Sequence, residues 1–144
     1  VDEQTGIRVG PQMEPIGDGK IDYEEAMRRF KIYREWLCGL YVNIMNIIHY
    51  MHDKYAYEKS QMAFLHSDIG RLMAFGVAGL SVTADSFSAI KYADVYPIRN
   101  ETGLIVDYKT EGTFPKFGND ADRVDGIAVA LTQGTIRELK KPKT

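Results

Sequence analysis

The sequence contains a single cysteine, Cys38, whose thiolate would be the strongest nucleophile that this chain could offer. It lies in the middle of an apolar helical pattern, far from any helix N-terminus that would stabilise a thiolate. A free cysteine among apolar residues usually packs as a small hydrophobic side chain. We therefore interpret Cys38 as structural and predict no catalytic residue at this position.

His49, His52 and Asp53 are the residues most suited to binding a metal ion. Histidines three positions apart share one side of a helix, but a metal site needs a further ligand at a defined position. The sequence shows no such ligand nearby, so polar groups at the edge of an apolar helix are the favoured interpretation, and we predict no metal site.

Gly76 and Gly79 raise the possibility of a phosphate-binding loop. The stretch 74–79 has neither the dinucleotide-binding fingerprint nor the Lys-Ser/Thr end of a P-loop. Small residues among large apolar ones instead predict a tightly packed, buried segment, whose helical or extended conformation the pattern leaves open. The individual residues therefore indicate no assembled active site.

The composition excludes several classes of protein. The chain has 144 residues, 44% of them hydrophobic and 26% charged, as in one ordinary globular domain. Its net charge is -2 without a basic stripe, which disfavours nucleic-acid binding, and no apolar run is long enough to cross a membrane. Residues 1–4 carry no secretion signal, and a single cysteine fits a reducing compartment, so we expect a cytoplasmic protein.

One long helix is predicted within residues 22–60, after an irregular, glycine- and proline-rich connector over residues 1–21. Asp22 can cap this helix, and Glu25 completes a capping-box pattern. The helix is expected to run from Tyr23 to about Tyr57. Its apolar stripe recurs at three- and four-residue steps and comprises Phe30, Tyr33, Leu37, Leu40, Tyr41, Ile44, Ile48, Met51 and Tyr55.

This helix is too long and too apolar for a free-standing domain of this size. About 35 residues would span roughly 50 Å, whereas a compact chain of this length is roughly 35–40 Å across. Trp36, Val42 and Tyr50 lie off the stripe, so the helix is apolar nearly all round, as in helices buried within larger proteins. We predict that these three residues are unusually exposed here. Together with the missing initiator methionine, this pattern predicts an internal piece of a longer protein.

The remaining elements give a mixed α/β chain that is mostly helical. Within the segment 61–94, a helix capped by Ser81 or Thr83 should turn Phe87, Ile90 and either Tyr92 or Ala93 inward. A β-hairpin is predicted over residues 95–112, with arms 95–99 and 104–111 around a turn at 100–103. One face of the second arm should be more exposed to solvent than the other.

A loop and a last helix complete the chain over residues 113–144. Asn119 or Asp120 is predicted to cap this helix. Its inward residues are expected to be Val124, Ile127, Ala128, Leu131 and Leu139.

Three stretches resemble pyruvate formate-lyase, a family of glycyl-radical enzymes. They are Asn46–Tyr55 (NIIHYMHDKY), Ala78–Ala93 (AGLSVTADSFSAIKYA) continuing to Arg99, and Phe114–Asp125 with its FPKFGND motif. Their order and separations also resemble those of the family. The resemblance covers nearly the whole chain and implies an internal fragment of a ten-stranded α/β barrel.

The resemblance also implies an activity for the longer protein. Members of the family act as formate C-acetyltransferases that interconvert pyruvate and coenzyme A with acetyl-CoA and formate, through a glycyl radical and a cysteine thiyl radical. Neither the family's adjacent cysteine pair nor its radical-glycine motif occurs in this chain. The fragment is therefore expected to bind no cofactor and to be inactive alone. The implied partners are the rest of the parent chain, a second copy in a homodimer, and a radical-SAM activating enzyme.

One position is implied to keep a functional role. Leu65-His66 resembles a Leu-His step of the family whose histidine is linked to coenzyme A. His66 lies one position late relative to the following Arg71-Leu72-Met73, so two interpretations stay open. Either His66 faces the coenzyme A path near Gly76–Ser81, or it is an ordinary loop histidine.

Two further alternatives remain. The same motifs fit another glycyl-radical enzyme, such as a 2-oxobutyrate formate-lyase or a diol dehydratase. A non-catalytic interaction module that binds a partner through its apolar helix is the alternative from a different class.

Overall fold

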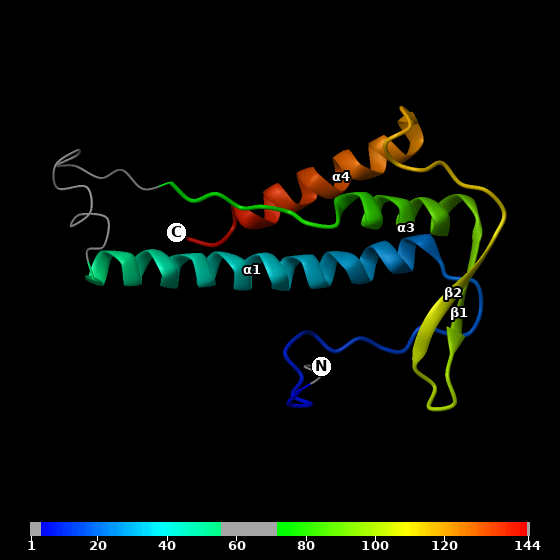
Figure 1. Ribbon diagram of the computed structural model, residues 1–144, viewed down its shortest axis with the longest axis horizontal. Helices are drawn as coiled ribbons and strands as arrows, with labels where there is room; N and C mark the ends of the chain where they lie inside the picture. The colour runs from blue at the N-terminus through cyan, green and yellow to red at the C-terminus, as the bar shows by residue number, and fades with distance from the viewer. Residues whose placement is uncertain (1–3, 56–71, 144) are drawn as a thin grey trace.

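The computed structural model describes residues 4–55 and 72–143, and shows three helices and one β-hairpin (Figure 1). The helices are α1 (Tyr23–Tyr55), α3 (Leu80–Tyr92) and α4 (Asp122–Leu139), and the strands are β1 (Asp94–Arg99) and β2 (Ile105–Glu111). α3 and α4 lie along one side of α1, and the hairpin extends from the end of this layer where α1 begins. The predicted mixture of helices with one hairpin is confirmed.

The start of α1 follows the predicted capping pattern in part. The backbone N–H of Glu25 donates to Asp22 Oδ1 over 2.8 Å, which satisfies one of the unpaired N–H groups at the helix start. The Glu25 carboxylate does not complete the capping box, because it accepts from Arg28 and Arg29 one turn further along. From this cap the helix is continuous for 33 residues, as predicted for the part that the structure describes.

The main core lies where the N-terminal part of α1 meets α3 and α4. Its buried members are Ala84, Phe87, Val124, Ile127, Ala128 and Leu131. The Phe87 ring meets Tyr23 and Phe30 edge-to-face, with ring centroids 6.1 and 5.3 Å apart. The inward residues predicted for α4 are therefore confirmed, apart from Leu139, which is only partly buried.

A second, smaller cluster joins the hairpin to the helices. Ile21, Ala89 and Val95 are its buried residues, and the Ile21 N–H donates to the Val95 carbonyl over 2.9 Å. The Arg99 guanidinium extends the link, because it pairs with Asp18 at 2.6 Å and donates to the Ile16 carbonyl. The connector is thus fastened along β1 just before α1 starts.

The predicted hairpin is present, and its antiparallel strands place Tyr96 opposite Lys109 and Pro97 opposite Tyr108. Asn100 Oδ1 accepts hydrogen bonds from the turn at residues 102 and 104, and Gly103 has a φ of 81° that favours glycine. Six of the seven β2 residues are nevertheless exposed, so neither face of this strand is buried by the described residues.

Two predicted helix caps are wrong. α3 begins at Leu80 with Gly79 at the cap position, and the Thr83 hydroxyl donates back to the Gly79 carbonyl over 2.9 Å instead of capping. α4 begins after Ala121, again without a side-chain cap, whereas Asn119 and Asp120 lie in the preceding loop. Ser81 and Thr83 cannot cap α3 because they lie inside its first turn, and the loop before α4 places Ala121, not Asn119 or Asp120, at the cap position.

The exposure predicted for the off-stripe residues of α1 is only partly correct. Tyr50 is 62% exposed, but Val42 is fully buried and Trp36 is partly covered by the connector near Gly10. The error for Val42 has a geometric cause. Residues 30, 34, 38 and 42 follow one another at four-residue steps and form the side of α1 nearest to α4, whereas most of the predicted stripe is exposed.

Residues 72–79, which were expected to belong to a buried segment, form an irregular extended stretch that is mostly exposed. The Phe75 ring in this stretch makes an edge-to-face contact with Tyr41, with the ring centroids 5.0 Å apart. The prediction of burial is therefore not met within this chain, because no described element covers the outer side of the stretch. None of the helices among the described residues has the length and apolar character needed to span a membrane.

Candidate functional site

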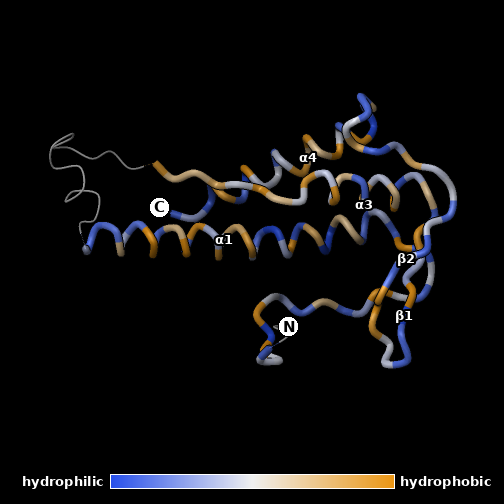
Figure 2. The backbone as a smooth tube through the Cα atoms, viewed as in Figure 1, coloured by the Kyte–Doolittle hydropathy of each residue, from blue (hydrophilic) through white to orange (hydrophobic). Residues whose placement is uncertain are grey.

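A groove of about 410 Å³ lies between α1, the stretch 76–80 and α4. Its walls are mainly apolar, with Phe30, Leu37 and Tyr41 on α1 facing Leu131 and Leu139 on α4. Figure 2 shows the mixed hydropathy of the three segments that border it. A concave apolar surface with few polar groups is the usual form of a binding site for a small molecule or a peptide.

Among the residues that the structure describes, Arg34 is the only charged one that lines the groove. Its guanidinium lies against α4 at Gly134, where a Cβ would come within 2.1 Å of Nη1, and 5.8 Å from the Phe30 ring centroid. The Nε atom is buried and has no hydrogen-bond partner in the described part of the chain. A buried donor without an acceptor is destabilising and uncommon in native structures.

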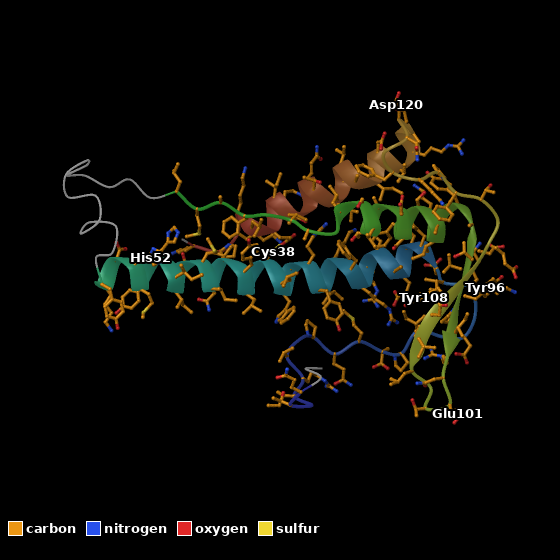
Figure 3. The ribbon with its side chains drawn as sticks, viewed as in Figure 1. Cys38, His52, Tyr96, Glu101, Tyr108 and Asp120 are labelled. Carbon is orange, nitrogen blue, oxygen red and sulfur yellow. The ribbon has the colours of Figure 1, made fainter. Side chains whose placement is uncertain are left out.

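Cys38 lines the same groove one turn after Arg34 and is 5% exposed. Figure 3 shows it midway along α1, on the side of the α4 helix. Burial raises the pKa of the thiol, and Glu138 raises it further, while Arg34 acts in the opposite direction. The thiol is therefore protonated at neutral pH, which agrees with the structural role inferred from the sequence.

His49 and His52 belong to the C-terminal part of α1 and are not among the residues that line the groove. Figure 3 shows His52 near that end of the helix. His49 and His52 are both partly buried. No set of three or more His, Cys, Asp or Glu side chains suited to a metal ion occurs within residues 4–55 and 72–143. The described residues thus offer no metal site at this position.

Gly76 and Gly79 do not play the role predicted for them. A Cβ at either position would meet no atom of the described residues within 4 Å, so no close approach of those residues requires a glycine there. Gly79 is instead favoured by its φ of 75°, which the chain adopts as it enters α3. Gly134, which the sequence analysis did not single out, is the glycine that allows a close contact.

His66 lies outside the described residues, so its predicted role stays a prediction. Sequence reasoning missed Arg34 and Gly134, because an arginine and a glycine in separate helices give no local signal that they meet. The four-residue steps from Phe30 through Arg34 to Cys38 could have indicated a shared face, but the charge of Arg34 argued for a solvated one.

Comparison with known proteins defines the class of protein. The family model "Pyruvate formate lyase-like" matches residues 1–144, and the chain therefore belongs to this family. It is also similar to Formate acetyltransferase 1 of Escherichia coli strain K12, with 50% identity over 144 residues. The match covers 100% of this chain and 19% of that enzyme, so the chain spans about a fifth of its relative's length.

Proposed function

We propose that this chain forms an internal part of a formate C-acetyltransferase. The observation that carries the proposal is the 50% identity to Formate acetyltransferase 1, sustained over all 144 residues. In the proposed reaction the carbon–carbon bond of pyruvate is cleaved, the acetyl group is transferred to the thiol of coenzyme A, and the carboxylate leaves as formate. Pyruvate and coenzyme A are thus the substrates.

The described residues support a structural contribution to this enzyme. Their one thiol is buried and protonated, and the groove between α1 and α4 is mainly apolar. The resemblance assigns the radical glycine and the catalytic cysteines to other parts of the parent chain. We therefore propose that residues 1–144 serve as scaffold within the ten-stranded α/β barrel, and that His66 contributes to the coenzyme A path.

The same proposal includes the setting and the partners of the enzyme. The parent would act in the cytoplasm as a homodimer, and a radical-SAM enzyme would install its glycyl radical. The net charge of -2 supports the absence of a nucleic-acid partner. Exposed apolar residues along α1 support a large contact surface with the remainder of the parent chain.

The test compares the full-length parent with this chain alone. After incubation with the activating enzyme and S-adenosylmethionine, the parent should give a glycyl-radical electron paramagnetic resonance signal and form formate from pyruvate. The isolated chain should do neither. Absence of formate formation by the fully activated parent would refute the proposed activity.

Cys38 and His66 provide the matched variants for this test. Cys38→Ser should leave turnover by the parent unchanged, because a buried, protonated thiol does not act as a nucleophile. His66→Ala should slow transfer of the acetyl group to coenzyme A while formate release continues. Unchanged kinetics for coenzyme A in the His66→Ala enzyme would leave His66 as a loop residue.

A further inference from the structure

The hairpin leaves one of its two edges unpaired. Along β1 the connector covers the outer edge, where the Ile21 N–H donates to the Val95 carbonyl over 2.9 Å. Among residues 4–55 and 72–143, β1 is the only strand that pairs with β2, so the outer edge of β2 has no partner strand there. Such an edge presents free N–H and C=O groups to which a further strand can bind.

The backbone groups on this free edge can be identified from the pairing with β1. Val95 turns its carbonyl to the connector, and Pro97, two residues later, has no N–H to donate to β2. The Tyr108 N–H, opposite Pro97, donates over 2.7 Å to the carboxylate of the preceding residue. Because inward and outward positions alternate along a strand, Tyr108 and Thr110 direct their N–H and C=O groups away from β1.

The charges of β2 favour one way of pairing this edge with a second copy of itself. A two-fold axis at Tyr108 makes the two strands antiparallel and places Asp107 opposite Lys109 of the second copy, on both sides of the axis. All seven residues of β2 then lie opposite residues of the other β2. An axis at Asp107 or at Lys109 would instead oppose like charges, which is destabilising. An axis at Thr110 opposes Lys109 and Glu111, but it pairs fewer of the seven residues.

The charged side chains are accessible for this contact. Asp107 and Lys109 are both exposed, and Lys109 pairs with Glu111 at 2.6 Å in an ion pair that solvent reaches. On pairing, the Tyr108 carbonyl of the second copy would accept the Tyr108 N–H, which releases the Asp107 carboxylate for Lys109 of the second copy. Asp107 and Lys109 would form a non-hydrogen-bonded pair, in which the Cα atoms are about 4.5 Å apart and the side chains are closest. The register shift of the hairpin lies nearer the turn, so this part of β2 is regular.

We propose that β2 is a self-pairing edge through which two copies of the parent chain associate. Joined antiparallel around Tyr108, the two hairpins form one sheet in the order β1–β2–β2–β1. The two ion pairs between Asp107 and Lys109 fix its register. The inference rests on the proposed function, because it takes the second copy from the homodimer proposed there, and it adds the surface by which the copies meet.

Photo-crosslinking of the full-length parent tests which strand covers the edge. With p-benzoylphenylalanine in place of Tyr108, irradiation should give a product with twice the mass of the polypeptide, in which both linked peptides contain residues from 105–111. Figure 3 shows Tyr108 in β2 and Glu101 at the tip of the hairpin. The same probe in place of Glu101 is the control and should give no such product, because the tip lies away from the proposed axis. A crosslink from position 108 to another segment of the same chain, to a different part of the second copy, or to nothing would overturn the proposal.

Charge reversal tests the register. Lys109→Glu places a carboxylate opposite Asp107 of the second copy, so the yield of the two-copy product from the probe at position 108 should fall about tenfold. Asp107→Lys should have a similar effect. The double variant Asp107→Lys/Lys109→Asp exchanges the two charges and should restore the yield, whereas Glu101→Lys is the matched control and should not change it. A double variant that stays as low as the single ones would refute this register.

The outcome can be separated from that of the proposed activity, because formate production is assayed on the same preparations. A parent that makes no formate but links β2 to β2 would support the pairing and refute the activity. An active parent whose position 108 forms no link between copies would refute the pairing alone.

Discussion

The two halves of α1 have very different surroundings. The N-terminal half is capped by Asp22, contacts the core through Tyr23, Ala26 and Phe30, and is covered by α3 and α4. The C-terminal half exposes large apolar side chains on several faces: Leu40, Ile44, Ile47, Ile48, Tyr50, Met51 and Tyr55. One continuous helix thus joins a folded core to an uncovered surface.

This difference shows that the formation of a helix and its burial have different determinants. Local periodicity and a cap are sufficient to specify α1 over its whole described length, whereas burial depends on what the surrounding chain supplies. The relative is about five times as long as this chain, since only 19% of it is matched. The uncovered half is therefore where we expect the parent to contribute its packing.

The largest effect should come from removing the ring at the centre of the core. Phe87→Ala deletes both edge-to-face contacts and leaves a cavity, so the free energy of unfolding of this chain should fall by about 3–5 kcal/mol. Ile48→Ala in the uncovered half should change it by less than about 0.5 kcal/mol. Urea unfolding followed by circular dichroism measures both values. Similar losses in the two variants would mean that the halves do not differ.

A smaller effect is expected from a buried polar group in the packed region. Ser88 is fully buried, and its hydroxyl donates to the Pro115 carbonyl over 2.6 Å. Ser88→Ala should lower the free energy of unfolding by about 1–2 kcal/mol, because the carbonyl loses its donor. Ser86→Ala is the control, since this exposed hydroxyl only donates to the Val82 carbonyl of its own helix. A neutral Ser88→Ala in thermal unfolding would contradict the assignment.

The boundary between the two halves can be tested at Arg34 and Gly134. Gly134→Ala should gain about 1 kcal/mol of helix propensity, but in the native chain the added Cβ displaces the Arg34 guanidinium. The gain should therefore appear fully only in the Arg34→Ala background. A double-mutant cycle by urea unfolding should give a coupling free energy of about 1 kcal/mol. Additive effects would show that the two side-chain positions do not meet.

The smallest effect concerns the charge cluster at the start of α1. Hydrogen bonds from Arg28 and Arg29 lower the pKa of Glu25 from its ordinary value of 4.5 to about 2. A carboxylate with a lowered pKa stabilises the folded state above its ordinary pKa, and this contribution is lost as the pH falls from about 4.5 towards 2. Because the cluster is exposed, the effect should be slight.

The measurement compares the unfolding temperatures of the native chain and Glu25→Gln at several pH values. The native chain should unfold at a slightly higher temperature at pH 7, and the difference should vanish near pH 2. Glu24→Gln is the control, since the described contacts of Glu24 include no ion pair. A difference that grows on acidification would contradict the predicted sign.

The predicted elements succeeded where the signal was local. The cap of α1 at Asp22, the hairpin turn at Asn100 and the inward positions of α4 all depend on residues within one or two turns of one another. The predicted caps of α3 and α4 were wrong, because α3 begins before Ser81 and Thr83, and Ala121 rather than Asn119 or Asp120 lies at the cap position of α4. The groove was not predicted at all, since its walls come from segments about 40 to 100 residues apart.

The sequence alone determined that α1 is one continuous helix over its described part, that a hairpin follows α3 and, through the motifs at Asn46–Tyr55 and Phe114–Asp125, the family. These properties depend on periodicity, turn chemistry and residue identity, all of which involve residues close together in the sequence. The tertiary structure decided which side of α1 is buried. A helix that is apolar nearly all round offers several equivalent faces, and only packing against α4 selects the face with Cys38 and Val42. The same packing places Arg34 against Gly134, because close contact between two helices depends on where both backbones run.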